Sequence, residues 1–397
     1  MIGEKITGCE LSSRINGLKR LLKSHNIDLA LIRQNADLYY FSGTVQDSHL
    51  LIPVDCDPIL LVWRVYERAL LESSLDKKYH LPSFSKLPDF LRRFSLDKAL
   101  TIGLELDTMP AKHFFIYKKL WPKAKFLDIS ELIRQLRAVK SKWEINQIKA
   151  SCVQIKEVID KVPSVLREGI SELELHSFIC GELQKKGHPG FFRMRAWNQE
   201  LLFGQVLAGS SGNVASWTLT PAGGVGLGPA YGVSASRRRI SKGEPILVDF
   251  GGWVNGYLCD QSRMFVLGKA SDKIKYYFNW IVELHKKIEL LLKPGTLCGQ
   301  LYDFSFKEAE KIGVEKYFMG PLGNQVRFIG HGLGIELDEY PFISKGNKMI
   351  LKESMVVAIE PKVCIPDIGL IGIEDTYLIT EKGAERLTLS PQELIEV

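Results

Sequence analysis

Two apolar segments in the second half of this chain each carry a pair of acidic residues, one on either side of a turn. The first segment, PILVDFGGWVNGYLCDQSRMFVLG, runs from Pro245 to Gly268, and its strand-like arms flank a turn signal at 254–256. Asp249 lies on one arm and Asp260 on the other. The pattern predicts an antiparallel hairpin that carries both carboxylates.

The turn decides which residues of this hairpin face one another, and two registers are open. With a loop of 255–256, Asp249 faces Ser262 and Asp260 is its diagonal neighbour. With a loop of 254–255, the two aspartates face each other directly. Either register puts both carboxylates on one face of the sheet, within reach of a common ion.

Two aspartates on one apolar hairpin require a positive partner. Aspartate is disfavoured in strands, and two anions this close repel each other unless a cation lies between them. A metal ion would supply that charge. The alternative is that the side chain of Arg263 neutralises one of the two aspartates.

The second segment, MVVAIEPKVCIPDIGLIGIEDTYLIT, repeats this arrangement from Met355 to Thr380. Glu360 ends one apolar strand and Glu374 lies in the next. A three-residue turn at 366–368 would place the two glutamates opposite one another. Four carboxylates are thus expected on two hairpins.

A single histidine lies between the two hairpins in sequence. In IGHGLGIELDEYP, from Ile329 to Pro341, His331 has a glycine on each side, and glycines let the backbone approach a ligand closely. One imidazole with four carboxylates is a ligand set suited to Mn, Co, Fe or Zn in a two-metal hydrolytic site.

The first part of the chain alternates helical and strand-like segments. Ile27–Arg33 and Pro58–Arg64 are apolar runs of strand length, and Arg14–His25 has the apolar spacing of a helix. This alternation predicts an α/β domain over residues 1–137. A charged segment, Arg134–Ala150, then begins one long helical pattern that continues through residue 162, and the domain at 138–397 contains the acidic hairpins.

Composition excludes several classes of protein. Of 397 residues, 45% are hydrophobic and 25% are charged, as in a globular protein with two domains. No run approaches the roughly 20 apolar residues of a membrane span, and the first residues lack the apolar core of a secretory signal, so we expect a cytoplasmic protein without a membrane partner. The seven cysteines include no C-x-x-C pair, which argues against a disulfide framework and a zinc ribbon.

Two other segments could suggest anionic ligands. The net charge is +6, but the densest basic run, SRRRISKG at 236–243, lacks the interleaved aromatic residues of a nucleic-acid site, so we expect no nucleic-acid partner. The glycine-rich stretch PAGGVGLGPAYG at 221–232 lacks the G-K-[S/T] ending of a phosphate loop. We expect it to form a flexible loop over the mouth of the site.

The order Asp, Asp, His, Glu, Glu resembles that of the M24 "pita-bread" metallopeptidases, which include methionine aminopeptidase, aminopeptidase P, prolidase and the related creatinase. The motifs that carry the resemblance are VDFGGWVNGYLCDQS, GHGLGIELDEYP, AIEP and GIED, in the domain from about Ser141 onward. NADLYYFSG, at 35–43, is similar to the creatinase/prolidase N-terminal domain. The resemblance implies an α/β (α+β) fold. A creatinase/prolidase-like domain at 1–137 would precede a pita-bread domain of antiparallel sheet with flanking helices at 138–397, in the aminopeptidase P, prolidase and creatinase branch.

The resemblance also implies a role for each ligand. Asp249 would bind one metal ion, His331 and Glu360 the other, and Asp260 and Glu374 would bridge them. Two divalent ions per chain, Mn or Co first and Zn or Fe as alternatives, would activate a water, and Glu360 would be catalytic, relaying the proton to the leaving nitrogen. The substrate would be a small peptide or peptide-like compound, and the chain a homodimer.

The positions expected to contact substrate depart from the family pattern. Asp338 and Arg327 stand where histidines follow and precede the ligand histidine, and Tyr231 and Gly232 take the place of a third. Gly372 replaces an arginine two residues before the last glutamate. Asp338 would favour an amine on the substrate and Arg327 a carboxylate, unless the two pair with each other, and Tyr231 is a third candidate for substrate binding. Since the missing histidines stabilise developing charge, a standard Xaa-Pro peptidase reaction should be slow.

Two classes of function remain open. The first is a divergent di-metal hydrolase that cleaves a peptide-like C–N bond, with a creatinase-like, non-peptidase reaction as a variant. The second is a catalytically silent domain that binds a peptide or protein. Four clustered acids repel one another when no metal is bound, and a pure binding module has no need of them. The ligand set therefore favours the hydrolase.

Overall fold

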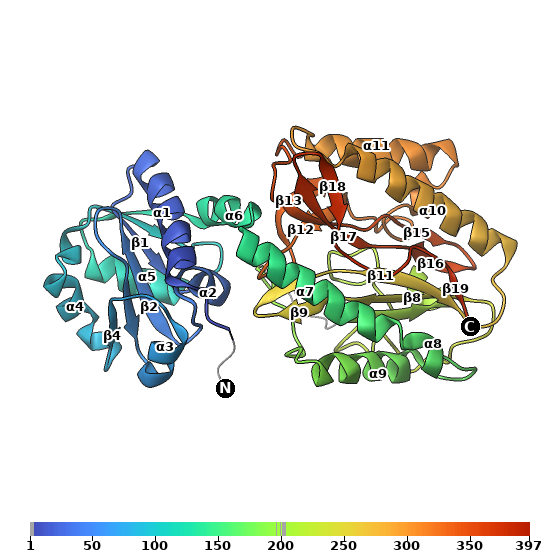
Figure 1. Ribbon diagram of the computed structural model, residues 1–397, viewed down its shortest axis with the longest axis horizontal. Helices are drawn as coiled ribbons and strands as arrows, with labels where there is room; N and C mark the ends of the chain where they lie inside the picture. The colour runs from blue at the N-terminus through green and yellow to red at the C-terminus, as the bar shows by residue number, and fades with distance from the viewer. Residues whose placement is uncertain (1–3, 196, 199, 201–203) are drawn as a thin grey trace. The chain divides into compact units, whose positions relative to one another are not determined.

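The computed structural model describes residues 4–195, 197, 198, 200 and 204–397 and divides the chain into two compact units (Figure 1). The N-terminal unit comprises Met1–Arg137 with Arg195–Trp197, and the C-terminal unit comprises Ala138–Met194 with Asn198–Val397.

The N-terminal unit is an α/β domain built on one mixed sheet of six strands, in the order β4-β3-β2-β1-β5-β6. The strands are β1 Leu29–Ile32, β2 Ser48–Pro53, β3 Ile59–Val62, β4 Lys78–His80, β5 Thr101–Leu104 and β6 Lys125–Asp128. The α-helices are α1 Gly8–Ser24, α2 Asn35–Ser42, α3 Tyr66–Glu72, α4 Leu87–Arg93, α5 Ala111–Leu120 and α6 Ser130–Ala138. β1 pairs antiparallel with β2 and parallel with β5.

The predicted elements of this unit are confirmed. The apolar runs at 27–33 and 58–64 contain β1 and β3, whose residues are all buried. A strand that is covered on both faces has a continuous apolar sequence and does not alternate apolar with polar residues. The length of each apolar run therefore identified these strands. The predicted helix at 14–25 belongs to α1, which begins earlier because the side chain of Thr7 caps its first turn.

The C-terminal unit is an assembly of mainly antiparallel sheets, in which β19 pairs parallel with β11, with helices on either side (Figure 1). Its larger sheets have the orders β19-β11-β8-β7 and β13-β12-β14-β17-β18, and two short ladders, β9-β10 and β15-β16, extend the hairpins. The strands are β7 Gly204–Ala208, β8 Pro245–Phe250, β9 Gly252–Val254, β10 Tyr257–Cys259, β11 Ser262–Val266, β12 Phe328–Gly332, β13 Glu339–Ser344, β14 Val356–Ile359, β15 Lys362–Ile365, β16 Gly369–Gly372, β17 Asp375–Thr380, β18 Gly383–Arg386 and β19 Ile395–Glu396.

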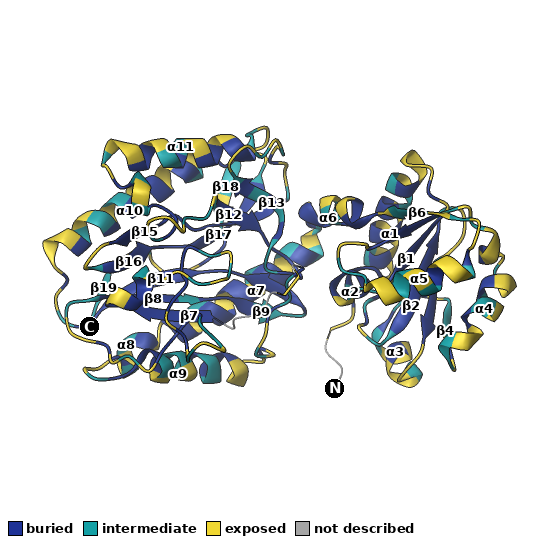
Figure 2. Cartoon of the chain, turned by 180° about the vertical axis from the view of Figure 1, so that it is seen from behind, coloured by how far each residue is buried: buried dark blue, intermediate teal, exposed yellow. Residues whose placement is uncertain are grey.

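The helices of the C-terminal unit cover its sheets and leave their polar faces to solvent. They are α7 Lys142–Ile159, α8 Val162–Val165, α9 Glu172–Lys185, α10 Asp272–Leu291 and α11 Cys298–Lys311. α7 contacts β9 and β10, α9 contacts β7, α10 contacts β16 and β18, and α11 contacts β12 and β13. Most residues of the strands between them are buried (Figure 2). This burial gives the unit a continuous apolar core.

The prediction of one long helix from Arg134 was wrong, because the chain forms two helices there. α6 ends at Ala138 and α7 begins at Lys142. Ser141 caps α7 with a reciprocal capping box, in which its side chain accepts from the backbone of Glu144 and the Glu144 carboxylate accepts from the backbone of Ser141. The helical spacing of apolar residues continues across residues 139–141, between the two helices. Ser141, with Glu144 three residues later, is nevertheless the signal for a new helix start.

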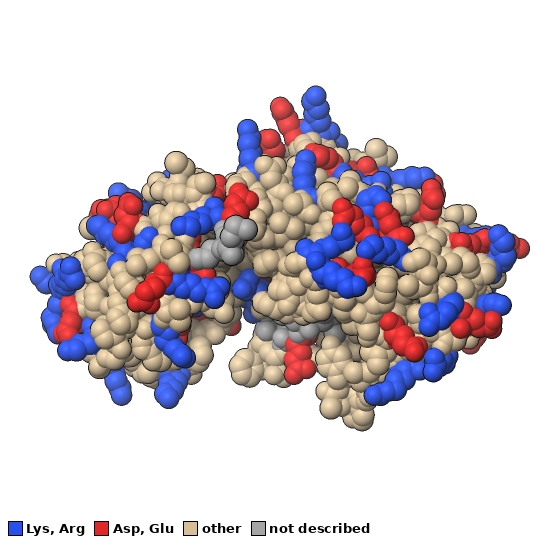
Figure 3. Space-filling view, turned by 60° about the horizontal axis from the view of Figure 1, so that its bottom comes forward, with Lys and Arg blue, Asp and Glu red and all other residues tan. Residues whose placement is uncertain are grey.

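On the face shown in Figure 3, basic and acidic side chains are interspersed. The seven cysteines are free thiols. Among the described residues, no helix is long and apolar enough to cross a membrane.

A candidate metal centre

The first acidic hairpin adopts the register set by a loop of Asn255 and Gly256. Val254 pairs with Tyr257, and the same register carries Asp249 opposite Ser262. Asn255 has a φ of 48° and Gly256 a φ of 88°, which is the backbone of a two-residue hairpin turn that matches the twist of the strands. Of the two registers open from the sequence, the structure has the one in which Asp260 is the diagonal neighbour of Asp249.

The second acidic hairpin holds its glutamates directly opposite one another. Ile359 pairs with Asp375 on one side of them, and Lys362 pairs with Gly372 on the other. The same register therefore runs through Glu360 and Glu374, as the three-residue turn at 366–368 predicted. Asp367 in that turn has a φ of 62°, the left-handed residue that such loops require.

His331 projects from β12, an interior strand between β13 and β14. Its flanking glycines lie against neighbouring backbone: a Cβ on Gly330 would be 2.2 Å from the Ala358 carbonyl oxygen, and one on Gly332 would be 2.1 Å from that of Tyr340. The His331 Nδ1 lies 3.0 Å from the Gly332 carbonyl oxygen. This contact keeps a proton on Nδ1, so that Nε2 carries the lone pair when the imidazole is neutral. Burial alone would lower the pKa of His331, but the carboxylates of Asp338, Glu360 and Glu374 raise it.

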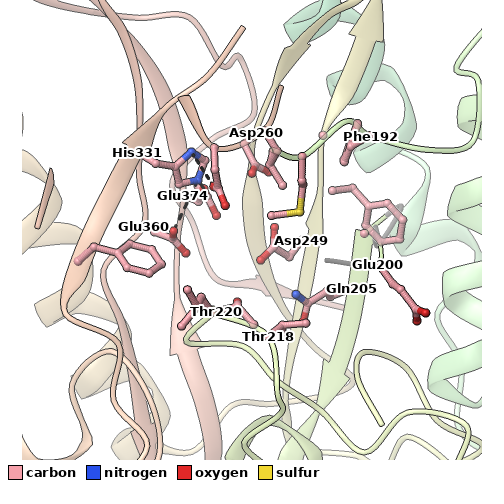
Figure 4. A pocket seen from close by; sticks show the side chains of 18 residues that line it. Phe192, Glu200, Gln205, Thr218, Thr220, Asp249, Asp260, His331, Glu360 and Glu374 are labelled. Carbon is pink, nitrogen blue, oxygen red and sulfur yellow. Dashed lines mark ion pairs between the residues drawn. The ribbon is translucent and has the colours of Figure 1, made fainter. Parts of the chain in front are cut away.

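The His331 ring faces the carboxylates of both glutamates (Figure 4). Its Nε2 is 3.7 Å from Glu360 Oε1 and 3.9 Å from Glu374 Oε1. Donor atoms of Asp260, His331 and Glu374 all lie within 4.8 Å of one another, and all three residues are buried. The five predicted ligands therefore converge on one pocket, which Asp249 also lines.

A residue that sequence reasoning missed, Lys362, lies among these acids. Its Nζ donates to Glu360 Oε2 at 2.7 Å and to Glu374 Oε2 at 2.8 Å, and it lies 3.5 Å from Asp249 Oδ2. Only 1% of its side chain is exposed. Strand alternation could have found it, since a lysine two residues after Glu360 in an apolar strand must share its face.

Burial and mutual repulsion dominate the titration of three of the acids. Burial raises the pKa of Asp249 to about 6, against the opposing charge of Lys362. Burial also raises the pKa of Asp260 well above its usual range, and the nearby carboxylates add to this shift. The pKa of Glu360 is raised by burial to about 7, again against Lys362. Such acids hold a proton readily unless a cation replaces it.

The pKa of Glu374 shifts in the opposite direction from those of Asp249, Asp260 and Glu360. Burial alone would raise the pKa of Glu374, but Lys362 and His331 lower it below its usual value. Burial alone would lower the pKa of Lys362, and the carboxylates of Glu360, Glu374 and Asp249 outweigh this and raise it. Glu374 is therefore a carboxylate and Lys362 an ammonium group.

Hydrogen bonds from neighbouring side chains orient two of the acids. Ser262, opposite Asp249 in the register, donates its hydroxyl to Glu374 Oε2 at 3.0 Å. The Asp260 backbone N–H donates to Thr376 Oγ1 at 3.0 Å, and that hydroxyl donates back to the Asp260 carbonyl at 2.9 Å. Neither Ser262 nor Thr376 was singled out from the sequence, because a hydroxyl in a strand carries no distinctive pattern.

Arg263 does not neutralise Asp249 or Asp260, so the alternative that assigned it to them was wrong. Its side chain leaves the opposite face of β11 from Ser262 and pairs with Asp375 at 2.5 Å. Both side chains of this pair are fully buried. The arginine therefore supports the sheet behind the site, and the carboxylates in front of it need another cation.

The three candidate substrate residues lie differently with respect to the pocket. Asp338 lines it, and its Oδ1 is 3.6 Å from His331 Nδ1. Arg327 is exposed and Tyr231 is half-buried, and neither is among the described residues that line the pocket. The remaining lining is mostly apolar or uncharged. It comprises Phe192, Met194, Gly204, Gln205, Thr218, Leu219, Thr220, Phe250, Gly251, Phe328 and Leu337, with Glu200 as a further acid.

The donor set fits one divalent ion well and a second one poorly. Asp260, His331 and Glu374 offer oxygen and imidazole donors at a common position, and Glu374 Oε1 is buried there without a hydrogen-bond partner among the described residues. A buried carboxylate oxygen in that state is suited to binding a cation. On the Asp249 side, by contrast, the Lys362 ammonium already engages the carboxylate oxygens.

Comparison with known proteins covers nearly the whole chain. The family model of metallopeptidase family M24 matches residues 146–381, and that of the creatinase/prolidase N-terminal domain matches 14–139. The Xaa-Pro dipeptidase of Pyrococcus furiosus is 28% identical over 387 residues, which cover 97% of this chain and 100% of the relative. The crystal structure of the prolidase from Pyrococcus horikoshii has a TM-score of 0.80 at 26% identity and covers 96% of this chain and 100% of its own. A Xaa-Pro dipeptidase from Bacillus anthracis has a TM-score of 0.83 at 23% identity, covers 98% of this chain and 100% of its own, and shares the fold.

Proposed function

This chain belongs to metallopeptidase family M24 and is a metal-dependent hydrolase, and we propose that it removes the first residue from short peptides with proline in second place. The observation that carries the proposal is the convergence of His331 with four buried or nearly buried carboxylates in one pocket. The relatives named above as Xaa-Pro dipeptidases support the same substrate class.

The catalytic chemistry divides between a metal ion and the residues beside it. A divalent ion held by Asp260, His331 and Glu374 would supply a Lewis acid that lowers the pKa of water and polarises a carbonyl. Glu360 lines the same pocket, and burial raises its pKa to about 7, so it exchanges a proton readily near neutral pH. We assign Glu360 the transfer of that proton to the leaving nitrogen. Manganese or cobalt suits this oxygen-rich donor set, with zinc or iron as alternatives.

The rest of the pocket favours a substrate with a free amine. Asp338 and Glu200 are acidic, and none of the described residues that line the pocket is lysine or arginine. An ammonium group on the substrate would pair with Asp338, while Phe192 and Phe250 offer apolar surface for a proline ring. An N-blocked peptide would lack this pairing. The silent binding domain and the creatinase-like reaction gain no support from this lining.

We expect the chelator-stripped protein to be inactive on Ala-Pro and to regain slow hydrolysis with Mn²⁺ or Co²⁺, because none of the described residues that line the pocket could act as the Lewis acid. Glu360→Gln should lower kcat by about 10²–10⁴-fold, the range for loss of a general acid–base group. Glu353→Gln, in the exposed turn before β14, is the matched control. The readout is released proline, with N-acetyl-Ala-Pro compared in parallel.

Two outcomes would contradict the proposal. Metal-loaded protein that leaves every Xaa-Pro peptide intact would argue for another C–N bond as substrate. Equal turnover of the acetylated peptide would remove the role given to Asp338. The homodimer and the count of two ions per chain remain predictions from the resemblance, and the cytoplasmic location remains a prediction from composition.

A further inference from the structure

Lys362 is a cation built into the site, and we propose that its ammonium group takes the place of one of the two metal ions, so that the chain binds a single divalent ion at Asp260, His331 and Glu374. This inference rests on the proposed function, in that it concerns the same pocket. It departs from the two-ion site that the resemblance implies.

The backbone register dictates where the Lys362 side chain goes. Lys362 follows Glu360 by two residues, so both side chains leave the same face of the hairpin. Its cross-strand partner is Gly372, which precedes Glu374 by two residues and also shares that face. A Cβ on Gly372 would lie 2.3 Å from Lys362 Cγ. The lysine therefore reaches the carboxylates only because its partner is a glycine.

Lys362 and Gly372 together put a positive charge on the opposite strand of the hairpin from the one that carries it in the family pattern. The family pattern has an arginine where this chain has Gly372, and the lysine stands at the residue directly across the ladder. The position of the charge differs as a result. The Lys362 Nζ lies between Glu360, Glu374 and Asp249.

The two glutamates divide their oxygens between two cation positions. The Oε2 atoms of Glu360 and Glu374 accept hydrogen bonds from Lys362, at 2.7 and 2.8 Å. Their Oε1 atoms face the opposite way, toward His331 Nε2 at 3.7 and 3.9 Å. Glu374 Oε1 is buried with no hydrogen-bond partner among the described residues. One position is thus filled by the ammonium, and the other has donors for an ion.

A second ion could not share the ammonium's position. It would need the oxygens that Lys362 already engages and the Asp249 carboxylate 3.5 Å from the Nζ, and two cations that close repel strongly in a buried site. The Lys362 side chain is also enclosed by the protein, since only 1% of it is exposed. The ammonium is therefore a permanent occupant, unlike an ion that exchanges with the medium.

Metal counting tests this inference without recourse to activity. Protein stripped with a chelator, reloaded with Mn²⁺ and freed of excess should contain one equivalent per chain by mass spectrometry, and its EPR spectrum should be that of an isolated Mn²⁺ ion. Lys362→Met keeps the length of the side chain without its charge and should bind two equivalents, with an exchange-coupled pair. Lys352→Met, an exposed lysine in the preceding turn, should retain one.

Several results would overturn the inference. Two equivalents, or a coupled pair, in the unaltered protein would show that Lys362 gives way to a second ion, and this measurement stands even if Lys362→Met fails to fold. No bound metal would remove the ion position altogether. A single equivalent in a folded Lys362→Met protein would mean that the ammonium occupies no ion position. Hydrolysis of Ala-Pro is scored separately, so the proposed function can fail with the metal count intact, or the reverse.

Discussion

At the scale of single residues, Gly372 is important because it has no side chain and leaves space for that of Lys362. Its added Cβ would meet Lys362 at Cγ and Cβ, 2.3 and 2.9 Å away, and the Pro361 carbonyl oxygen at 3.0 Å. Two of these three contacts belong to the lysine side chain. The glycine and the lysine therefore form one functional unit, in which neither residue can be understood alone.

Gly372→Ala should lower the free energy of unfolding of the Mn²⁺-loaded C-terminal unit by about 1–3 kcal/mol, the usual cost of overpacking. In a Lys362→Gly background the same change should cost less than half as much, because only the Pro361 contact remains. Urea unfolding of the four proteins gives the coupling energy. Equal costs in both backgrounds would show that the lysine side chain does not need this space.

The sequence predicts the five candidate ligands but not the lysine among them. Acids are conspicuous in apolar strands because a carboxylate there must find a cation. Lys362 satisfies the same condition, and strand alternation places it on the face of Glu360, but a lysine next to acidic residues is more often a solvent-exposed charge. Arg263 was misassigned for the same reason: it neighbours Ser262 in sequence but leaves the other face of the strand.

At the scale of elements, two turns set the geometry of the site. The Asn255–Gly256 turn holds Asp249 opposite Ser262, and the turn at 366–368 holds Glu360 opposite Glu374. A one-residue slip of either hairpin would move its carboxylates to the wrong face. The turn backbone is thus as important to the site as the ligands are.

Gly256→Ala should destabilise the C-terminal unit by about 1–2 kcal/mol, since an L-residue pays this much for a left-handed conformation. Its Tm should fall by roughly 2–4 °C per kcal/mol, and Mn²⁺ affinity should fall with it. Gly181→Ala is the matched control: it lies inside α9, where an added Cβ meets nothing within 4 Å, and should be neutral or stabilising. Equal effects from the two changes would contradict the role of the turn.

Helices and strands could be predicted from the sequence wherever a single local pattern, such as an apolar run or a turn residue, was clear. The buried strands and the second hairpin loop followed from apolar runs and turn residues. The first hairpin left two registers open because Val254, Asn255 and Gly256 can all enter a tight turn, and only pairing along the whole ladder selects one. The break between α6 and α7 was missed because helical periodicity outweighed a short capping signal.

At the scale of the whole molecule, both units bury neutral histidines. Burial lowers the pKa of His49 well below its usual value, and the Arg33 guanidinium adds to this shift. Burial likewise lowers the pKa of His285, which lies 2.9 Å from the Ile359 carbonyl oxygen beside Glu360. A histidine that stays neutral when folded and takes a proton when unfolded destabilises the fold in acid.

The contribution of His49 to the free energy of unfolding should have its full value above the unfolded pKa near 6.5. It should decline as the pH falls toward the lower pKa of the folded state. The slope is about 1.4 kcal/mol per pH unit for one proton. The difference in unfolding free energy between the unaltered protein and His49→Gln should therefore shrink from pH 6.5 to about 5. Denaturant unfolding of the N-terminal unit measures it, with the exposed His80→Gln as the surface control. A difference independent of pH would refute the assignment.

Because β12 is an interior strand, its neighbours on both sides hold the backbone of His331 in place whether or not a metal ion is bound. His331 is held on a strand with backbone close on both sides, and the glutamates are held across a ladder whose spacing is about 4.7–4.9 Å in any sheet. When an ion leaves such a site, its bonds to the ligands are lost, but the strands that carry the ligands stay paired. The protein can therefore lose and regain its metal as a reversible exchange, with the empty form already shaped for the next ion.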